Sequence, residues 1–392
     1  MKDKPQPPLA PPHVFVFLEI FACEGGIQSY VKDILYAYQQ AAIASKVSRF
    51  PQAEVYLLRD SVDCDNPFDS RKNPNAPNVF RFHYCQSAWT WLGRFRLGGA
   101  LLLRCWRRRP QWIVCGHIKL APLIQFLGGW FDIPYTVMTY GKEVWKPLGS
   151  RYRQALCQAK TIWTISRYSR DRACASNDLD PGKFKMLPCA VDGEVFSPAP
   201  KPPHLLDRYN LQGSRVLMTV ARLWSGDIYK GVDVTIRALP KILEVCPDVK
   251  YLVIGRGDDQ PRLENLAREL GIGDRVVFAG FVPTEELPDH YRVADAYIMP
   301  SQEGFGIVYL EAMATGIPVL SGDSDGSADP LQDGRLGWQV PHRDPEAVAT
   351  ACIEILQGSD RRCDGDWLRQ ETLAAFSSEA LSRRLREILP RS

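Results

Sequence analysis

The stretch that decides the fold reads SQEGFGIVYLEAMATGIPV, from Ser301 to Val319. Its apolar residues recur at helical spacing over 306–315, and Gly316 suits the left-handed cap that ends many helices. Glu303 then lies in the loop ahead of this helix, and Glu311 lies inside it, about two helical turns further on. The apolar run that follows reads as a strand, so the pattern predicts an α/β sheet with two carboxylates near one helix start.

The start of this helix is suited to an anionic or sugar ligand. The backbone amides near Phe305, Gly306 and Ile307 stand at the positive end of the helix, where a phosphate or a sugar hydroxyl binds well. A carboxylate accepts paired hydrogen bonds from vicinal hydroxyls, so Glu311 suits a ribose and Glu303 a hexose. The alternative is a pair of solvated helix glutamates without a ligand.

With its flanking Gly-Phe-Gly and Ala-Met-Ala-Thr-Gly, the stretch resembles the glutamate-pair motif of retaining nucleotide-sugar glycosyltransferases of the GT4 type. The resemblance covers most of the chain from Val14 onward and is most specific over 215–338. It implies the α/β architecture called GT-B, with two Rossmann-like domains facing a central cleft.

Length and composition set the bounds of this interpretation. A chain of 392 residues is long enough for two domains, and 45% apolar with 24% charged residues is typical of a globular protein. The net charge of +3 does not by itself indicate nucleic acid as a partner. The eleven cysteines include no Cys-x-x-Cys pair, which favours reduced thiols over a zinc site or disulfides. We therefore expect neither a metal nor a cofactor.

The sequence predicts a cytoplasmic location. No apolar run approaches the length of a membrane span, and residues 1–12 are proline-rich without the apolar core of a signal peptide.

Two series of alternating strands and helices divide the chain, which favours parallel sheets covered on both faces. In order, we expect strands at 14–18, 55–58, 79–82, 112–115, 135–139, 162–165, 216–220, 251–254, 276–278, 296–299 and 319–321. In the first series, helices are expected at 27–44, 101–108, 120–126 and 166–175.

The predicted domain boundaries follow from these series and from the prolines. They give a leader at 1–12, an acceptor domain at 13–197, a proline-rich linker at 198–203, a nucleotide-sugar domain at 204–370 and a tail at 371–392. The tail is helical in pattern, and the family resemblance implies that it packs back on the first domain.

Two cations flank the loop after the first strand of the second series. Arg222 ends the strand region and Lys230 precedes a glycine and the next helix, so both lie beyond the carboxyl end of a strand, where ligands of open α/β sheets bind. An Arg fork and a Lys point charge can neutralise a departing diphosphate, as a divalent metal would otherwise do. Taken alone, such a pair is usually a pair of surface residues. Its spacing together with the glutamate pair is that of the GT4 family.

Two places in the first series are expected to line the site. Gly25 and Gly26 open the first helix, where glycines let the backbone approach an anion closely; in the family the equivalent residues face the donor phosphates and the acceptor. His117 follows a strand, and the resemblance makes it a contact of the donor sugar, although a lone His is more often structural.

In the second series, Gly255 and Arg256 follow one strand and Val282 follows the next. The resemblance implies that they wall the base and ribose, with backbone hydrogen bonds from Val282 to the base.

A separate signal lies between Phe80 and Arg109. This segment holds three tryptophans and six arginines, namely Trp89, Trp91, Trp106, Arg94, Arg96, Arg104, Arg107, Arg108 and Arg109. Aromatic and Arg side chains on one helical face suit an anionic membrane surface, where lipid carriers are found. The alternative is a solvated basic helix with buried aromatics. No nucleic-acid module accompanies the arginines, so nucleic acid is not expected as a partner.

Taken together, the residues and the resemblance predict a retaining, metal-independent glycosyltransferase that moves a hexose from a UDP- or GDP-sugar to a hydroxyl. The acceptor is a glycan, a lipid carrier or a small molecule, and peripheral contact with the inner face of a membrane is expected. Arg222 and Lys230 would stabilise the diphosphate, Glu303 would orient the sugar, and His117 would face the anomeric centre. Alternatives are a nucleotide-sugar epimerase or hydrolase of the same fold, and a non-catalytic sugar-binding protein.

Overall fold

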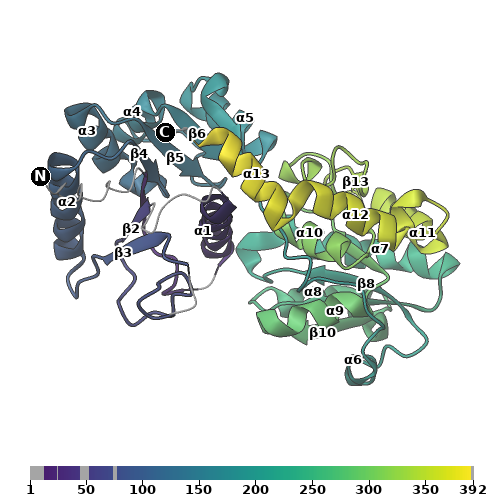
Figure 1. Cartoon of the computed structure of the whole chain (residues 1–392). Coiled ribbons are helices and arrows are strands. Elements are labelled where there is room, and N and C mark those ends of the chain that lie inside the picture. Colours follow the sequence, from purple (N-terminus) through teal and green to yellow (C-terminus); the bar gives the residue numbers. More distant parts are fainter. Residues whose placement is uncertain (1–12, 24, 45–52, 74–76, 390–392) are drawn as a thin grey trace, which may run out of the picture. The chain divides into compact units, whose positions relative to one another are not determined.

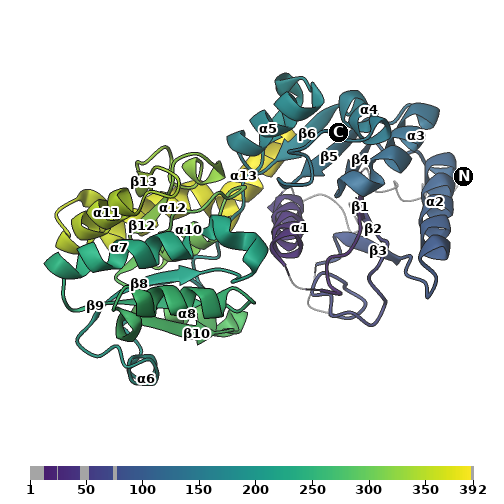
Figure 2. The ribbon, with the colours of Figure 1, turned by 180° about the vertical axis from the view of Figure 1, so that it is seen from behind.

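The computed structural model describes residues 13–23, 25–44, 53–73 and 77–389, and it falls into two compact units. The first unit comprises residues up to Cys189 together with the segment from Leu381 onward, and the second comprises Ala190–Ala380. The predicted leader, 1–12, lies outside the described residues. Figures 1 and 2 show the two units from opposite sides.

A seven-stranded parallel sheet forms the first unit, in the order β3-β2-β1-β4-β5-β6-β7. Its strands are β1 (His13–Phe17), β2 (Ala53–Leu57), β3 (Phe80–Tyr84), β4 (Trp112–Cys115), β5 (Tyr135–Thr139), β6 (Thr161–Thr164) and β7 (Phe184–Met186). Its helices are α1 (Gly26–Ala44), α2 (Thr90–Arg107), α3 (Ala121–Phe131), α4 (Ser150–Gln158) and α5 (Arg167–Asn177).

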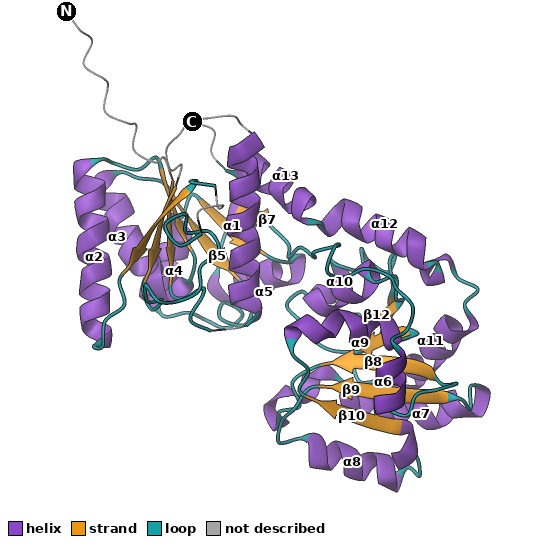
Figure 3. Cartoon of the chain, turned by 60° about the horizontal axis from the view of Figure 1, so that its bottom comes forward, coloured by secondary structure: helices purple, strands orange, loops and turns teal. Residues whose placement is uncertain are grey.

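The helices of the first unit cover both faces of its sheet. Figure 3 shows α2 and α3 on one side of the strands and α1 on the other. The core under α2 and α3 joins strand residues such as Val16 and Ile113 to helix residues such as Leu101 and Ile124. Every residue of β1, β2 and β5 is buried, as expected of parallel strands that are covered on both faces.

The second unit repeats this architecture with a six-stranded parallel sheet in the order β10-β9-β8-β11-β12-β13. Its strands are β8 (Arg215–Val220), β9 (Val249–Ile254), β10 (Val276–Gly280), β11 (Ala296–Met299), β12 (Val319–Gly322) and β13 (Trp338–Val340). Its helices are α6 (Pro203–Arg208), α7 (Val232–Val245), α8 (Gln260–Glu269), α9 (Leu287–Val293), α10 (Ile307–Ala314), α11 (Pro345–Gln357) and α12 (Gly365–Phe376). Residues of α7, α8 and α11 share one core with the strands, as Leu239, Leu263 and Val348 do. The order reverses at β8 and β11, the kind of switch point at which open α/β sheets bind ligands.

The predicted α/β architecture of two Rossmann-like domains is confirmed, but some elements differ from expectation. The helix expected at 101–108 is the longer α2, because its buried stripe starts already at Gly93 and continues through Leu97, Leu101 and Cys105. The short strands β7 and β13 and the helix α4 were not predicted, since three-residue strands and a polar nine-residue helix carry little periodicity.

The junctions between the units also differ. The predicted linker, 198–203, packs with the second unit, where Lys201 forms an ion pair of 2.6 Å with Asp295. The tail expected as one helix is two, α12 and α13 (Ser378–Ile388). The part of α13 from Leu381 onward belongs to the first unit, where Ser382 Oγ donates to the carbonyl of Ala37 at 3.4 Å.

Arg369 joins α12 to two backbone segments of the second unit, the loop at 193–196 and the end of α10. Its guanidinium donates to the carbonyls of Gly193 and Phe196, each at 2.7 Å, and to that of Ala314. Arg369→Met should lower the free energy of unfolding by about 2 kcal/mol, because three partly buried carbonyls lose charge-assisted bonds. Arg335→Met is the control, since its partner Glu371 lies on the same helix but the pair is exposed; it should cost less than about 1 kcal/mol. Urea unfolding of both variants measures the difference, and equal losses would contradict the role of Arg369.

Candidate functional site

The loop from Arg222 to Lys230 extends from the carboxyl end of β8. Its second half forms a 3-10 turn over Ser225–Lys230, and α7 begins two residues after Lys230. The amide of Gln302 donates to the carbonyl of Tyr229 at 3.1 Å, which ties this loop to the segment that carries Glu303. Two sequence-distant loops therefore meet where β8 and β11 lie side by side.

Lys230 and Glu303 are in direct contact. The Nζ atom of Lys230 forms an ion pair with Oε1 of Glu303, and each side chain is only 17% exposed. A half-buried ion pair needs both partners, because removing one leaves an uncompensated charge. The structure thus brings two of the predicted catalytic residues together at one point.

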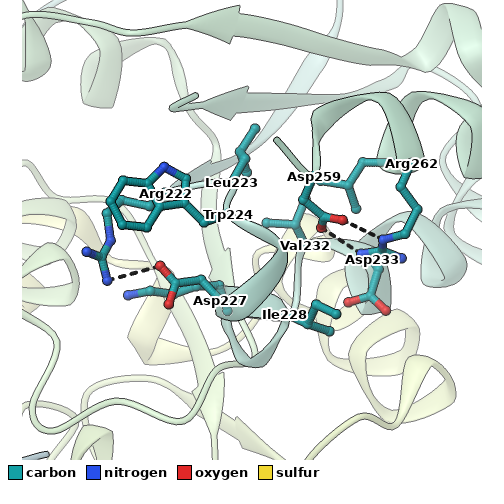
Figure 4. A pocket seen from close by; sticks show the side chains of 11 residues that line it. Arg222, Leu223, Trp224, Asp227, Ile228, Val232, Asp233, Asp259 and Arg262 are labelled. Atoms are coloured by element: carbon teal, nitrogen blue, oxygen red, sulfur yellow. Dashed lines mark hydrogen bonds and ion pairs between the residues drawn. The ribbon is translucent and has the colours of Figure 1, made fainter. Parts of the chain in front are cut away.

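Arg222 is held by a partner that the sequence did not single out. Its guanidinium lies 3.0 Å from the carboxylate of Asp227 and 5.0 Å from the centre of the Trp224 ring (Figure 4). The Arg222 side chain is 59% exposed, whereas that of Asp227 is 11% exposed. A pocket of about 10 Å³ lies among these side chains, with room for about one water molecule. Both predicted diphosphate cations are consequently paired with carboxylates.

The segment before α10 is shaped by Gly306. Its φ of +89° is in the left-handed region, and a Cβ there would lie 2.4 Å from the ring of Tyr309, so a larger residue does not fit. Because α10 begins at Ile307, the amides of Ile307 and Val308 lack intrahelical acceptors and form a positive end, whereas the amide of Tyr309 donates to the carbonyl of Gly306 at 3.2 Å. Phe305 is buried, with its ring 6.0 Å from that of Phe376, so Phe305 can face a ligand only through its backbone.

Asp325 fixes the position of Glu303. Its carboxylate accepts the amide of Glu303 and, at 2.8 Å, that of Ser327. Burial raises the pKa of Asp325 to about 6. Asp325 also ends an Asp-x-Asp triplet, Asp323-Ser324-Asp325, that directly follows β12. Among the described residues, no group of three or more His, Cys, Asp or Glu side chains is arranged to hold a metal ion.

Glu311 lies on α10 with its carboxylate in a buried setting. Tyr291 donates its hydroxyl to Oε2 of Glu311 at 2.7 Å, and the Tyr291 ring is itself fully buried. Burial raises the pKa of Glu311 to about 7, although the bond from Tyr291 favours the ionised form. Hydroxyl donors from a ligand would stabilise the carboxylate further.

The loops after β9 and β10 are held together by Gly255. Its φ is +136°, a Cβ would lie 1.8 Å from the carbonyl oxygen of Ala221, and its amide donates to Gly280 at 2.8 Å. Arg256 stacks on the ring of Phe281, 4.9 Å from its centre. The side chain of Val282 is buried, so it offers a ligand mainly backbone groups.

His117 belongs to the first unit, at the carboxyl end of β4. Its Nδ1 accepts the amide of Lys119 at 3.0 Å, and burial, aided by the charges of Lys119 and Arg59, lowers its pKa to about 4. The neutral ring then carries its proton on Nε2 and can donate one hydrogen bond. A pocket of about 130 Å³ lies beside it, lined among others by Glu19 and Gln28.

Gly25 and Gly26 stand at the start of α1, near the same pocket, which Ile27 helps to line. The loop before them is organised by Asp60, which the sequence did not single out. Its carboxylate accepts the amides of residues 20, 21 and 22 at 2.7–2.8 Å and is fully buried. An Asp that follows an apolar strand is the sequence signal that could have marked it.

One residue of the predicted arginine cluster is inside the protein. Arg104 is 9% exposed and forms an ion pair of 2.8 Å with buried Glu54 on β2. The expectation that Arg104 faces a membrane is therefore wrong. The long-range partner, which helical spacing cannot reveal, turns it inward.

Comparison with known proteins places this geometry in a family. Residues 214–358 match the family described as glycosyl transferases group 1. A GDP-mannose-dependent alpha-(1-6)-phosphatidylinositol monomannoside mannosyltransferase of Mycobacterium tuberculosis is 34% identical over 265 residues, which are 62% of this chain and 68% of that protein. The protein of the same description from Mycolicibacterium smegmatis is 36% identical over 231 residues, but these span 56% of this chain and 59% of that protein.

Solved structures agree on the fold. HepE of Anabaena in complex with UDP superposes with a TM-score of 0.73 at 16% identity, covering 96% of this chain and 98% of that one. Sucrose-phosphate synthase of Thermosynechococcus elongatus gives 0.69 at 20% identity, covering 97% and 98%. The fold and site define a glycosyltransferase of the GT-B architecture. The chain belongs to the glycosyl transferases group 1 family.

The buried carboxyl of Glu311 is expected to make both stability and nucleotide binding depend on pH. Its raised pKa means that the neutral carboxyl stabilises the folded protein at acid pH, and that this contribution is lost as pH rises through about 7. Ribose hydroxyls hydrogen-bond best to an ionised carboxylate, so a guanine nucleoside diphosphate whose ribose is held by Glu311 is expected to bind more tightly as pH rises from about 6 to about 8.

The control for this titration is 2′,3′-dideoxy-GDP, which has the same phosphates but lacks the ribose hydroxyls. Its affinity should change with pH only as far as the titration of the phosphates requires. Calorimetry of Glu311→Gln should give one profile for both nucleotides. If wild type binds the two nucleotides with the same pH profile, Glu311 does not hold the ribose.

Proposed function

We propose that the protein is a retaining, metal-independent mannosyltransferase that moves mannose from GDP-mannose to a hydroxyl of a lipid-linked acceptor. The observation that carries the proposal is the meeting of Lys230, Glu303 and the α10 start at the carboxyl ends of β8 and β11, with Arg222 on the same loop. The relatives are described as GDP-mannose-dependent phosphatidylinositol monomannoside mannosyltransferases, which supports the choice of donor and acceptor.

In the proposed reaction, the bond between the anomeric carbon and the β-phosphate oxygen breaks, and the acceptor oxygen attacks from the same face. The leaving phosphate oxygen takes the acceptor proton, so no separate base is needed. Arg222, Lys230 and the α10 amides would stabilise the charge that develops on the diphosphate. Glu303 would accept hydrogen bonds from the mannose hydroxyls. His117 of the first unit, whose ring is neutral, can donate one hydrogen bond from Nε2.

Charge balance supports the use of these cations. Arg222 and Lys230 have Asp227 and Glu303 as counter-anions within one loop system. A bound diphosphate would compete with these two carboxylates for hydrogen bonds from Arg222 and Lys230, and its negative charge would replace theirs beside the two cations. All eleven cysteines are free thiols, which fits a reducing compartment, and we place the reaction in the cytoplasm.

The first test is transfer itself, with labelled GDP-mannose, phosphatidylinositol monomannoside as acceptor and excess EDTA. We expect an α-linked product by NMR, since GDP-mannose is an α-donor, and an undiminished rate with the chelator. Mannose released without acceptor would indicate the hydrolase alternative, and a β-linked product would refute retention. Loss of activity in EDTA with rescue by manganese would refute metal independence.

Lys230→Ala tests the leaving-group assignment. Removing one fixed charge at a developing anion should lower kcat on the order of 100-fold. The matched control is Lys241→Ala on α7, whose exposed partner Glu346 makes it a surface ion pair of the same type, and it should leave kcat unchanged. Circular dichroism verifies that both variants fold, and a Lys230→Ala enzyme with the turnover of the control would remove Lys230 from the mechanism.

A further inference from the structure

The helix α2 of the first unit exposes large apolar side chains along its outer face. Its inner face is the buried stripe of Gly93, Leu97, Leu101 and Cys105. On the outer face Trp91, Phe95, Leu102 and Trp106 follow one another at spacings of four or seven residues, and Phe95 is 71% and Trp106 74% exposed. A surface helix of a monomeric protein normally carries polar residues there, so this stripe requires an explanation.

A second exposed aromatic pair lies on α3. Phe126 and Trp130 are one helical turn apart, their ring centres are 5.7 Å apart, and Trp130 is 72% exposed. The buried face of the same helix, with Ile124 and Leu127, packs on the sheet. The exposed rings are thus additional to a core that is already complete.

The two exposed faces belong to one surface. Helices α2 and α3 share a core and lie on the same side of the sheet (Figure 3). Their carboxyl-terminal ends are joined by an ion pair of 3.0 Å between Arg109 and Asp132. Trp106 and Trp130 each precede this pair by two or three residues. We call the exposed side chains of Trp91, Phe95, Leu102, Trp106, Phe126 and Trp130 the α2–α3 surface.

Positive charge surrounds the α2–α3 surface. The exposed arginines of the segment are Arg94, Arg96, Arg107, Arg108 and Arg109. An open hollow of about 470 Å³ adjoins α3 and is lined by Lys160 and Lys183 together with Gln125 and Gly129. Asp132, the carboxylate that lines this hollow, is already paired with Arg109. The apolar rings are thus surrounded by basic side chains, and the hollow lined by Lys160 and Lys183 is large enough for an anionic group.

We propose that the α2–α3 surface docks on an anionic phospholipid bilayer, with Trp106, Phe126 and Trp130 in the interface and lipid phosphates at the arginines and in the lysine-lined hollow. Tryptophan is favoured at the boundary between headgroups and acyl chains, and basic side chains are attracted to anionic lipid. Charge decides against a second copy of this chain, because two such faces would bring arginines against arginines. Among the described residues no helix is both long and apolar enough to cross a bilayer, and the proposed contact needs none.

Once Arg104 is known to be turned inward, the sequence pattern leaves three arginines and one tryptophan at the end of α2, and the proposed docking surface is larger than this group. The inference adds α3 and the hollow, and it makes apolar insertion the main contribution and charge the selective one. It rests on the proposed function only in supplying a reason for the protein to be at a membrane, because the docking itself involves neither donor nor acceptor.

The test is flotation of the full chain with vesicles, without nucleotide sugar. Vesicles of equal parts phosphatidylglycerol and phosphatidylcholine should bind the protein at least about tenfold more strongly than pure phosphatidylcholine, and added salt should weaken the binding. Trp106→Ser/Trp130→Ser should weaken binding to the anionic vesicles by about tenfold or more, since each substitution removes the apolar area that a tryptophan ring would bury in the bilayer. Both positions are exposed, so the fold should tolerate the changes.

The matched control is Tyr36→Ser/Ile43→Ser, two exposed apolar residues on α1, and it should bind like wild type. Equal binding of wild type to both kinds of vesicle, or a tryptophan variant that binds like the control, would overturn the proposal. So would a lipid-free dimer, seen by light scattering, that the tryptophan variant converts to monomer. Transfer of mannose to a water-soluble acceptor separates the two proposals. The tryptophan variant should lose vesicle binding but keep this activity. A wild-type protein that binds vesicles but transfers no mannose would refute only the proposed function.

Discussion

The functional part of this protein depends on one constraint, which is that parallel strands end at the same edge of a sheet. Because β8 and β11 are neighbours, the loops that follow them must meet, although Lys230 and Glu303 lie far apart in the chain. The ion pair between these two side chains, with the bond from Gln302 to Tyr229, joins the loops. A site for a phosphate and a sugar can then be built from loops alone, while the sheet supplies the rigidity.

Electrostatic balance is the second feature of this site. Each cation proposed for the diphosphate has a carboxylate partner, and Asp325 in turn holds the backbone of Glu303. Fixed charges that already have partners need little rearrangement when a ligand takes the place of one partner. The same carboxylates would lower the affinity for nucleoside diphosphate, which helps an enzyme that must release that product after every turnover.

The first unit shows how one helix can serve two purposes. The inner face of α2 packs on the sheet and is held there by Arg104 and Glu54, while its outer face carries exposed rings and arginines. The buried contact makes α2 rigid, so the apolar side chains opposite it are held outward at little entropic cost. For the proposed docking on a bilayer, this rigidity means that the backbone of α2 does not have to be ordered on binding.

The sequence by itself determined the α/β class, the two alternating series, most strand positions, and the loops that carry Arg222, Lys230, Glu303 and Glu311. These follow from the periodicity of apolar residues and from the residues that begin and end helices and strands, which are local properties of the sequence. The tertiary structure alone decided which partner each charge takes: Asp227 for Arg222, Tyr291 for Glu311, Asp60 for the loop before α1, and Glu54 for Arg104. It also decided that β7 and β13 are strands and that 198–203 packs with the second unit. The reason is physical: a hydrogen bond or ion pair between residues distant in the chain depends on the register and order of the sheet, and no local pattern encodes these.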